Sequence, residues 1–590
     1  MFQNFFSDYL VRLQEINKQW WQGLEIKSSV NSPLSEAIQK ISLEDSIQLL
    51  KKAGEQPAVL LQLQMQWWEQ QLQIWQNIAL AGKKKKFVEE EKEDKRFTNE
   101  LWKTDTFYNF IKQSYLLFSK TYLNTINSID GIDKPTKERL IFFSRQAINA
   151  LSPSNFVATN PELLKLTIEK NGENLLFGLE QLKRDLESSA DILKIRMNDN
   201  NACRIGDDIA NTEGDIVFSN DLFELIQYKP LTNTINSTPL LIVPPFINKY
   251  YILDLRKENS MVRWLLNKNH SVFMISWRNP GKKQAEIHFS DYVLEGVVKA
   301  VAVIEDITKQ EQINAAGYCI GGTLLASTIA YYSAKRMKKR IQSASFFATL
   351  LDFSQPGEIG AYINDTIVDA IEIQNNTKGY MDGRSLSVTF SLLRENTLYW
   401  NYYIENYLKG NSPMDFDLLY WNSDNMNVAA ACHNFLLREL YLENKLIKEK
   451  GIKIGGVWID LNKIRIPSYF ISAKEDHIAL WQGTYRGLLK SGGNNKTFVL
   501  SEAGHIAGVI NPPCKNKYGY WLNNNTTQSA DEWLASANYT KGSWWPHWHE
   551  WLMNLNSEKQ QIKPFKQGSE QNPVIAKAPG KYVKQVLPIT

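Results

Sequence analysis

Cysteine is scarce in this chain, which has four among 590 residues, namely Cys203, Cys319, Cys432 and Cys514. They lie far apart and form no Cys-x-x-Cys pair, and the seven histidines show no metal-ligand spacing. A disulfide framework and a zinc site both need such clusters. We therefore expect neither disulfides nor a bound metal.

The chain also lacks an excess of charge of one sign. Its 67 basic and 63 acidic residues leave a net charge of +4, which is too balanced to predict binding to nucleic acid. No apolar stretch approaches the length of a membrane span, and residues 1–8 lack the basic region and apolar core of a signal peptide. We expect a cytoplasmic protein with no transmembrane segment and no nucleic-acid partner.

What is present is a turn of the form Gly-x-Cys-x-Gly at Gly317, Cys319 and Gly321. An apolar run precedes it and a helix-forming run follows it, as in the nucleophile elbow, where a strand passes sharply into a helix. The glycines remove side chains that would collide in so tight a turn. Cys319 is therefore the candidate nucleophile, although a lone cysteine is more often a small buried hydrophobic residue.

Partners for a nucleophile follow downstream in the order acid, then histidine. Asp476 comes directly after the apolar run 466–473, and His505 follows the run 497–500, which we expect to be the last strand. His505 would take the thiol proton, and Asp476 would orient the imidazole. Glu475 and His477 are the neighbouring alternatives; we prefer Asp476 and His505, and place His477 in the pocket.

An oxyanion hole needs two backbone N–H groups near the nucleophile. The residue after Cys319, Ile320, supplies the first candidate. The second should follow the apolar run 239–243, where Pro244 and Pro245 have no N–H, so that the donor is one of residues 246–248. Of these we choose Ile247.

Residues 1–200 are predicted to form a mainly helical domain. An apolar stripe with spacings of four and three lines one helix face; it consists of Leu61, Met65, Trp68, Leu72, Trp75 and Ala79. We expect this stripe to pack in a helical core, with binding to a partner or a hydrophobic surface as the alternative that the nearby tryptophans favour. The run Lys83–Lys86 and the acidic residues after it are expected to form an exposed linker.

From residue 201 to 590, strands alternate with helices, which predicts a parallel sheet with helical crossovers. The alternation of strands and helices is interrupted at about residues 352–424, a segment that is rich in aromatic residues and predicted to be helical. The expected class is α/β, with an α/β-hydrolase fold and a lid at this segment. An apolar lid would exclude water from an acyl-enzyme.

Several long blocks of this sequence closely resemble the class I polyhydroxyalkanoate synthases, which polymerise 3-hydroxyacyl-CoA into storage polyester. The matching blocks are Pro244–Leu255, Ser276–Pro280, Gly317–Gly322, Tyr420–Asp424, Glu475–Ile478, Gly504–Pro513, Gly542–Pro546 and Ala578–Val583. The resemblance covers roughly Asp94 to the C-terminus.

The resemblance implies that Cys319 attacks the thioester of an (R)-3-hydroxyacyl-CoA, that CoA leaves, and that no cofactor is needed. It further implies a homodimer at the surface of polyester granules. Asn248, Trp421 and His477, which lie in the matching blocks, are candidates to line the pocket. Two other functions remain open: a cysteine-dependent thioesterase or depolymerase of the same fold, and a catalytically silent granule scaffold.

Overall fold

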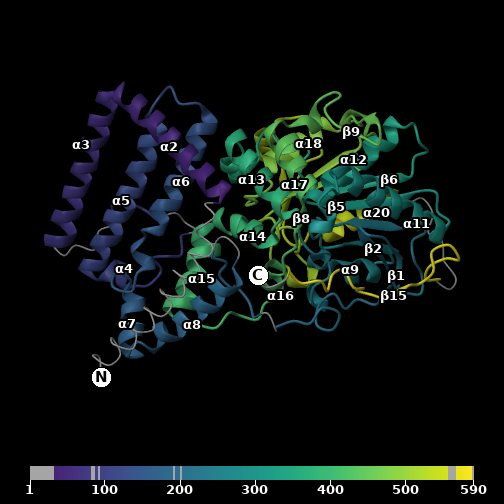
Figure 1. The fold of residues 1–590 in the computed structure, drawn as a ribbon, viewed down its shortest axis with the longest axis horizontal. Helices are drawn as coiled ribbons and strands as arrows, with labels where there is room; N and C mark the ends of the chain where they lie inside the picture. Colours follow the sequence, from purple (N-terminus) through teal and green to yellow (C-terminus); the bar gives the residue numbers. More distant parts are fainter. Residues whose placement is uncertain are drawn as a thin grey trace.

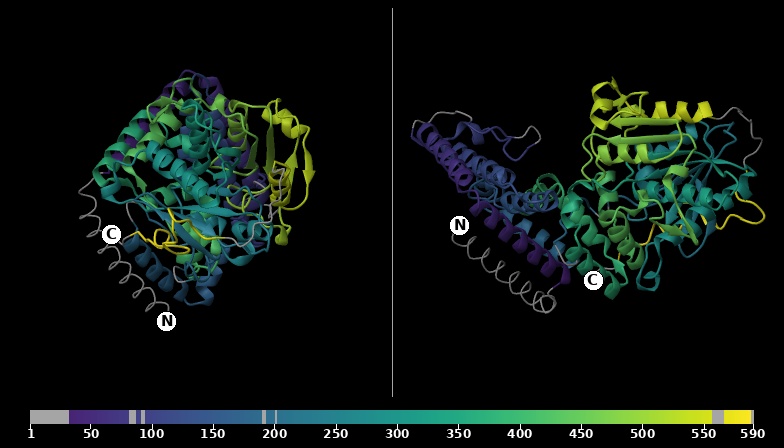
Figure 2. Two further views of the ribbon diagram at one scale, coloured as in Figure 1. Left: turned by 90° about the vertical axis from the view of Figure 1, so that its right-hand side faces the viewer. Right: turned by 90° about the horizontal axis from the view of Figure 1, so that it is seen from above.

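The protein is described by a computed structural model that places residues 32–80, 87–90, 94–189, 193–199, 202–555 and 566–587. A helical region precedes a mixed α/β region, and a helical insertion lies between the two (Figure 1). Figure 2 shows the same arrangement from two further directions. The expected linker at Lys83–Lys86, together with Trp20 and Trp21, lies outside the described residues.

The α/β region is built on one sheet of 11 strands in the order β14-β13-β12-β11-β6-β5-β3-β4-β2-β1-β15. Six neighbouring strands, β4, β3, β5, β6, β11 and β12, pair in parallel, and the pairs beyond them at both edges are antiparallel. The strands are β1 (Gly214–Ser219), β2 (Phe223–Tyr228), β3 (Leu240–Val243), β4 (Val272–Trp277), β5 (Ile313–Tyr318), β6 (Ile341–Phe347), β11 (Ser468–Ala473), β12 (Lys496–Ser501), β13 (Tyr520–Leu522), β14 (Asn538–Thr540) and β15 (Ala576–Lys577).

The inner parallel strands are buried along their length, and two apolar clusters form the core of the region. Burial on both sides explains why these strands read as short continuous apolar runs instead of alternating ones. The helices that accompany the sheet are α9 (Met261–Asn267), α11 (Lys299–Thr308), α12 (Ile320–Ala334), α18 (Trp481–Lys490), α19 (Ala530–Ala535) and α20 (Trp545–Leu555).

The expectation that residues 497–500 form the last strand is wrong. After β12 the chain adds β13 and β14 to the same edge, and β15 pairs with β1 at the opposite edge. These three strands are two or three residues long, and β14 and β15 are exposed. So short a strand carries too few residues for an alternating apolar pattern, which is why the sequence did not indicate them.

The insertion lies between β6 and β11 and runs from residue 348 to 467, so it extends well beyond the predicted lid of about 352–424. It is mainly helical, and its second half continues as helix after the lid was expected to end. Its main elements are η7 (Gly357–Tyr362), α13 (Asp365–Lys378), β7 (Tyr380–Met381), α14 (Gly383–Leu392), η8 (Asn396–Trp400), α15 (Asn401–Tyr403), η9 (Ile404–Leu408), α16 (Asp417–Ser423), β8 (Val428–Ala429), α17 (Ala430–Phe435), η10 (Leu436–Leu442), β9 (Lys453–Ile454) and β10 (Val457–Trp458).

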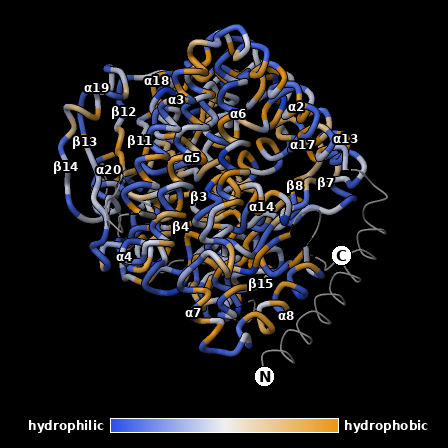
Figure 3. The backbone as a smooth tube through the Cα atoms, turned by 90° about the vertical axis from the view of Figure 1, so that its left-hand side faces the viewer, coloured by the Kyte–Doolittle hydropathy of each residue, from blue (hydrophilic) through white to orange (hydrophobic). Residues whose placement is uncertain are grey.

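Some of the helices in the region before the sheet begin at a side-chain cap. Asp133 accepts a hydrogen bond from the N–H of Thr136 at the start of α6, and Asp105 caps α5 in the same way. The helices are α2 (Pro33–Gly54), α3 (Pro57–Ile74), α4 (Leu101–Thr104), α5 (Thr106–Ser128), α6 (Lys134–Ala150), α7 (Pro161–Glu169) and α8 (Glu173–Ser188). Figure 3 looks onto this region from its outer side.

The helical region packs against the insertion. Ala37 and Ile41 of α2 join Ile367, Val368 and Ile371 of α13 in one apolar cluster. Helix α6 contacts η7, and α8 contacts η9. The insertion is therefore held between the sheet on one side and the N-terminal helices on the other (Figure 1).

The expected core packing of the apolar stripe on α3 is wrong. Leu61, Met65, Trp68 and Leu72 of α3, and Trp75 at the start of the π-helical turn η1 (Trp75–Leu80), are between 47% and 64% exposed. Ile74 is the residue of α3 that is buried, and the side chain of Ala79 lies outside the described residues. The core of this part forms instead around Ile74, Ile78, Phe97, Trp102 and Leu117. The helical period was read correctly, but periodicity alone does not reveal which face meets the protein. Within the described residues, no helix is long and apolar enough to cross a membrane.

Candidate active site

Cys319 occupies the turn between β5 and α12. Its backbone has φ 52° and ψ −126°, a region that residues other than glycine rarely adopt. The N–H of Cys319 donates to the carbonyl of Phe347 on β6 (2.8 Å), and its own carbonyl accepts from the N–H of Gly322 (2.9 Å). The surrounding hydrogen bonds thus hold the strained turn, and Cys319 lies directly before the first residue of α12.

The glycines around Cys319 are required by close packing. A Cβ on Gly317 would lie 2.4 Å from the Cα of Gly322, and a Cβ on Gly321 would lie 2.3 Å from the carbonyl oxygen of Val243. Both distances are shorter than real Cβ contacts, and the opposing atoms are backbone. The start of α12 therefore sits directly against the end of β3, as the elbow interpretation requires.

His505 and Asp476 are brought together from two neighbouring strand ends. Asp476 follows β11 and His505 follows β12, and these strands pair in parallel. Nδ1 of His505 lies 2.6 Å from Oδ2 of Asp476. The other carboxylate oxygen, Oδ1, accepts from the N–H groups of Ile478 and Ala479, both at 2.8 Å. Asp476 is buried with both oxygens bonded, so its orientation is fixed.

The surroundings of His505 favour its protonated form. Burial works to lower the pKa of His505, but the charges and hydrogen bonds of Asp476 and Cys319 outweigh it and raise that pKa well above its usual value. A proton leaving the Cys319 thiol therefore finds a stabilised acceptor on the imidazole. This arrangement can generate a thiolate in a largely buried site.

The two neighbouring alternatives are placed differently. Glu475 is exposed, and its backbone bonds to neighbours: its carbonyl accepts from Nη2 of Arg394 (3.0 Å), and its N–H donates to the carbonyl of Ala503 (2.9 Å). The Nε2 atom of His477 is buried and has no hydrogen-bond partner among the described residues. Burial, with the charge of Arg394 as the next cause, lowers the pKa of His477 to about 4, so its ring is neutral near pH 7. Neither side chain has the paired geometry of Asp476 and His505.

The loop after β3 lies next to the elbow, as the proposed oxyanion hole requires, because Gly321 packs against Val243 and Pro244. Ile320 is the first residue of α12, and the N–H groups of a helix's first turn have no partner within the helix. Ile247 is half-buried and packs on the larger core cluster. The roles of Ile320 and Ile247 as oxyanion donors remain predictions.

Two of the predicted pocket residues tie the loop after β3 to the insertion. The indole N–H of Trp421 donates to the carbonyl of Lys249 (2.7 Å), and Asn248 bridges to Asn425. Lys249 itself forms a buried ion pair with Asp424, with Nζ 2.7 Å from Oδ1. Trp421 and Asn248 therefore connect this loop to the end of α16.

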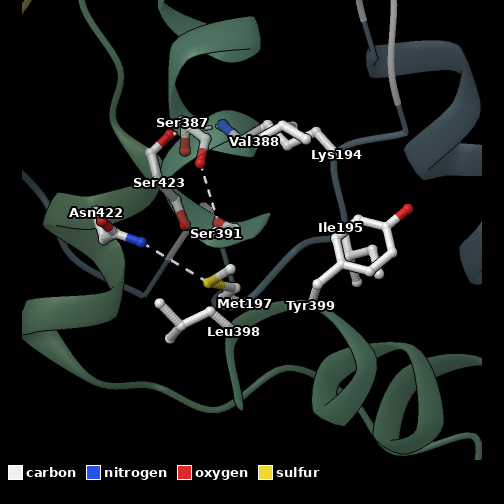
Figure 4. A pocket seen from close by; sticks show the side chains of 10 residues that line it. All are labelled: Lys194, Ile195, Met197, Ser387, Val388, Ser391, Leu398, Tyr399, Asn422 and Ser423. Carbon is white, nitrogen blue, oxygen red and sulfur yellow. Dashed lines mark hydrogen bonds between the residues drawn. The ribbon is translucent and has the colours of Figure 1, made fainter. Parts of the chain in front are cut away.

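A small cavity beside α16 continues this junction (Figure 4). It is lined by Lys194, Ile195 and Met197 together with residues of α14, η8 and α16. Lys194 donates to the carbonyl of Ser423 (3.0 Å), and burial lowers its pKa to about 8. The residues lining this cavity do not include Cys319, and we assign it no catalytic part.

Two tyrosines near the site were missed by the sequence analysis. Tyr318 donates its hydroxyl hydrogen to the carbonyl of His505 (3.1 Å). Tyr441, in the second half of the insertion, has its pKa raised by burial and by the charges of Cys319 and Asp476, which places it near both. Tyr318 adjoins the elbow and could have been suspected from that position. Tyr441 lies in η10, and nothing in its local sequence marks it.

Comparison with known proteins gives two family-model matches. Residues 93–265 match the model described as Poly-beta-hydroxybutyrate polymerase (PhaC) N-terminus, and residues 239–512 match the alpha/beta hydrolase fold. The second match confirms the predicted fold class. It spans β3 to the loop that carries His505, and so includes the whole candidate triad.

Curated relatives match over most of their length. The chain is 38% identical over 536 residues to the Poly(3-hydroxyalkanoate) polymerase subunit PhaC of Cupriavidus necator, covering 90% of this chain and 89% of the relative. It is 41% identical to the Poly(3-hydroxyalkanoate) polymerase of Methylorubrum extorquens, with 83% and 80% covered. It is 40% identical to the PhaC subunit of Rhizobium meliloti, with 84% and 80% covered. This chain belongs to the poly(3-hydroxyalkanoate) polymerase family.

Proposed function

We propose that this chain polymerises (R)-3-hydroxyacyl-CoA into polyhydroxyalkanoate through a covalent thioester on Cys319. His505 takes the proton from the Cys319 thiol, and the thiolate attacks the thioester carbonyl of the substrate. The bond to the CoA sulfur breaks, and CoA leaves as the thiol with the proton that His505 returns. Asp476 holds the imidazole and stabilises its cation throughout.

Elongation then forms an ester. The 3-hydroxyl of one acyl unit attacks the carbonyl of another acyl thioester, loses its proton to a general base, and releases the thiol. His505 and Asp476 are the two candidates for this base. Each cycle lengthens the polyester by one unit and releases one CoA, and no cofactor takes part.

Cysteine suits this reaction for an energetic reason. Exchange between a thioester and a thiol is nearly balanced in free energy, whereas a serine would form a more stable oxygen ester. A hydroxyl group can therefore accept the acyl group from Cys319 in a favourable step. Exclusion of water by the insertion would serve the same end, because water competes with that hydroxyl.

One observation carries the proposal, namely the 2.6 Å hydrogen bond between His505 and Asp476 next to a cysteine held at positive φ. A family member that served only as a scaffold would not need a buried carboxylate with both oxygens satisfied. A thioesterase would share this geometry, and the family membership favours the polymerase instead.

The test is incubation of the purified chain with (R)-3-hydroxybutyryl-CoA. We expect free CoA together with insoluble polyester. Free CoA with soluble 3-hydroxybutyrate would identify a thioesterase, and no release of CoA would identify a silent scaffold. Either of these two results would overturn the proposal.

We further propose that the protein works in the cytoplasm as a homodimer at the surface of polyester granules. The exposed apolar face of α3, formed by Leu61, Met65, Trp68 and Leu72 and continued by Trp75 of η1, supports a hydrophobic contact of this kind. Apolar aromatic side chains bind well to a surface that presents methyl and methylene groups. Sedimentation of the chain with and without granules tests both the dimer and the granule contact.

A further inference from the structure

Arg145 of α6 forms ion pairs with two separate turns of the insertion. Its guanidinium forms a two-pronged ion pair with Glu358, with Nη1 and Nη2 at 2.7 and 2.8 Å from the carboxylate oxygens, and its Nε lies 3.2 Å from Glu395. Asn149 and Gln146 of the same helix also donate to Glu395, at 2.6 and 3.0 Å. The side chain of Glu395 is 3% exposed, so these contacts surround a carboxylate that is buried in the protein.

The turns that carry Glu358 and Glu395 both contact the loop that carries Asp476. Beside Glu395, Arg394 donates from Nη2 to the carbonyl of Glu475 (3.0 Å). Beside Glu358, Gly357 lies so close to the loop that a Cβ there would be 3.1 Å from the carbonyl oxygen of His477. Gly357 also has φ +71°, which a side chain would strain. The insertion therefore contacts the loop on both sides of Asp476.

Backbone N–H groups of the same loop also hold the carboxylate of Asp476. The N–H groups of Ile478 and Ala479 hold Oδ1 of Asp476, and this leaves Oδ2 for His505. A shift of the loop backbone would therefore move the carboxylate relative to the imidazole. Displacements of about 1 Å in such a pair cost up to about a hundredfold in rate.

We infer that Arg145 is a positioning residue of the active site, through which the N-terminal helical region holds the loop that carries Asp476. The inference rests on the proposed role of Asp476 and His505. It assigns the helical region a part in acylation itself, separate from any contact with granules or with a second copy. The path runs from Arg145 to Glu358 and Glu395, then to Gly357 and Arg394, and then to the carbonyls beside Asp476.

Helix α6 offers a matched control. Arg139 forms a two-pronged ion pair with Asp45 of α2, with both N–O distances at 2.9 Å. Arg139 and Asp45 are more buried than Arg145 and Glu358, and their hydrogen bonds join α6 to α2 instead of to the insertion. Loss of this pair should weaken the helical region without moving the loop.

The experiment compares Arg145→Gln, Glu395→Gln and Arg139→Gln in the full chain. The first turnover of CoA release is followed by rapid quench across pH, and stability is followed by urea unfolding. We expect Arg145→Gln to slow the first turnover about tenfold, and Glu395→Gln to slow it less. In Arg145→Gln and Glu395→Gln, the part of the pH–rate profile that follows the titration of His505 should move to lower pH. The reason is that a displaced Asp476 raises the pKa of His505 less. Arg139→Gln should lose stability but keep the wild-type rate and profile.

The proposal is overturned if Arg145→Gln matches Arg139→Gln in both rate and pH profile. Should Arg145→Gln fail to fold, Glu395→Gln decides alone, since it keeps the shape of the side chain; a wild-type rate and profile in it overturns the proposal. Cys319→Ala in the otherwise native chain separates this outcome from a failure of the proposed function. If Cys319→Ala still forms polymer, the triad assignment is wrong, whatever Arg145 does.

Discussion

Tyr318, which directly precedes Cys319, contacts His505 in two ways. Its hydroxyl donates to the carbonyl of His505 (3.1 Å), and the two rings stack with their centroids 5.5 Å apart and their planes 24° apart. The residue before Cys319 thus contacts His505 through both its ring and its hydroxyl. The strand that presents Cys319 also positions the residue that we propose as its base.

Tyr318→Phe keeps the stacked ring and removes the hydrogen bond. We expect the free energy of unfolding to fall by about 1 kcal/mol and the rate of acylation to fall severalfold, because the backbone of His505 loses an anchor. Tyr332→Phe is the control, since the hydroxyl of Tyr332 is buried but has no partner among the described residues. Urea unfolding and rapid-quench release of CoA measure the two effects. Equal behaviour of the two variants would contradict the positioning role of Tyr318.

Cys319→Ala should abolish polymer synthesis and leave the fold intact. The substitution removes the nucleophile, while the lost packing is worth only about 1 kcal/mol. Cys514→Ala is the control, because Cys514 is exposed and far from the elbow in sequence. Turbidity from polymer and release of CoA report the activity. If Cys514→Ala is inactive and Cys319→Ala is active, the elbow assignment fails.

His505→Gln should slow the first acylation far more than His477→Gln. Only His505 has its ring bonded to Asp476, whereas the buried Nε2 of His477 has no partner among the described residues. General acid–base catalysis contributes about a hundredfold to ten-thousandfold, and we expect a loss in that range for His505→Gln. Rapid-quench measurement of CoA release compares the two. An equal loss in both variants would undo the choice of base.

Acid should destabilise the protein partly through His433, which is buried and accepts from the amide of Asn375 (3.0 Å). Burial lowers the pKa of His433 to about 4. The unfolded chain binds a proton at this residue below pH ~6.5 while the folded chain does not, so the free energy of unfolding falls as the pH drops from ~6.5 towards 4. At about 1.4 kcal/mol per unit of pKa, the loss is at most about 3 kcal/mol.

The measurement is urea unfolding at several pH values between 7 and 4. His433→Gln should show a shallower fall in stability over this range, because it has no group to titrate at this position. His288→Gln, which changes an exposed histidine, should follow the wild type. A wild-type slope in His433→Gln would show that His433 does not carry the effect.

The exposed face of α3 should matter for association with polyester but not for chemistry. A variant with Met65, Trp68 and Leu72 changed to serine should acylate at the wild-type rate, yet pellet less with granules and show a longer lag. Gln66→Ser with Gln70→Ser is the control, since it changes exposed polar residues of the same helix. Co-sedimentation with granules decides between them. If the serine variant pellets like the control, α3 has another role.

These surface changes test the N-terminal region more cleanly than a deletion. A chain that begins near Asp94 would lack α2 and α3, and so would uncover Ile367 and Ile371 of α13 and the cluster around Trp102. It would keep α6 and hence the ion pairs between Arg145 and the insertion. We expect such a chain to acylate Cys319, to polymerise slowly and to be less stable.

The elbow and its two partners could be predicted because each is a local pattern. Gly317, Cys319 and Gly321 are constrained by a single turn, and Asp476 and His505 each follow a buried strand. Tyr318 and Arg145 could not be predicted in the same way. Their roles depend on contacts between residues 187 and 250 positions apart, which the local sequence does not encode.

The exposed stripe of α3 shows a second limit of the sequence. Its period identified a helix correctly, but an apolar face looks the same whether it meets a core or an external surface. The insertion shows a third limit. Its second half alternates short helices with two-residue strands, and so gives no sustained period from which its length could be judged.

The pairing of β15 with β1 bears on how the chain folds. Lys577 lies opposite Asp215 in the ladder, and their side chains form an ion pair of 2.7 Å. During translation, β1 leaves the ribosome more than 350 residues before β15, the strand that covers this edge of the sheet. Contacts of such sequence separation form slowly, and an uncovered edge can pair with other chains. During synthesis, the nascent chain therefore exposes an edge on which chaperones would be expected to act.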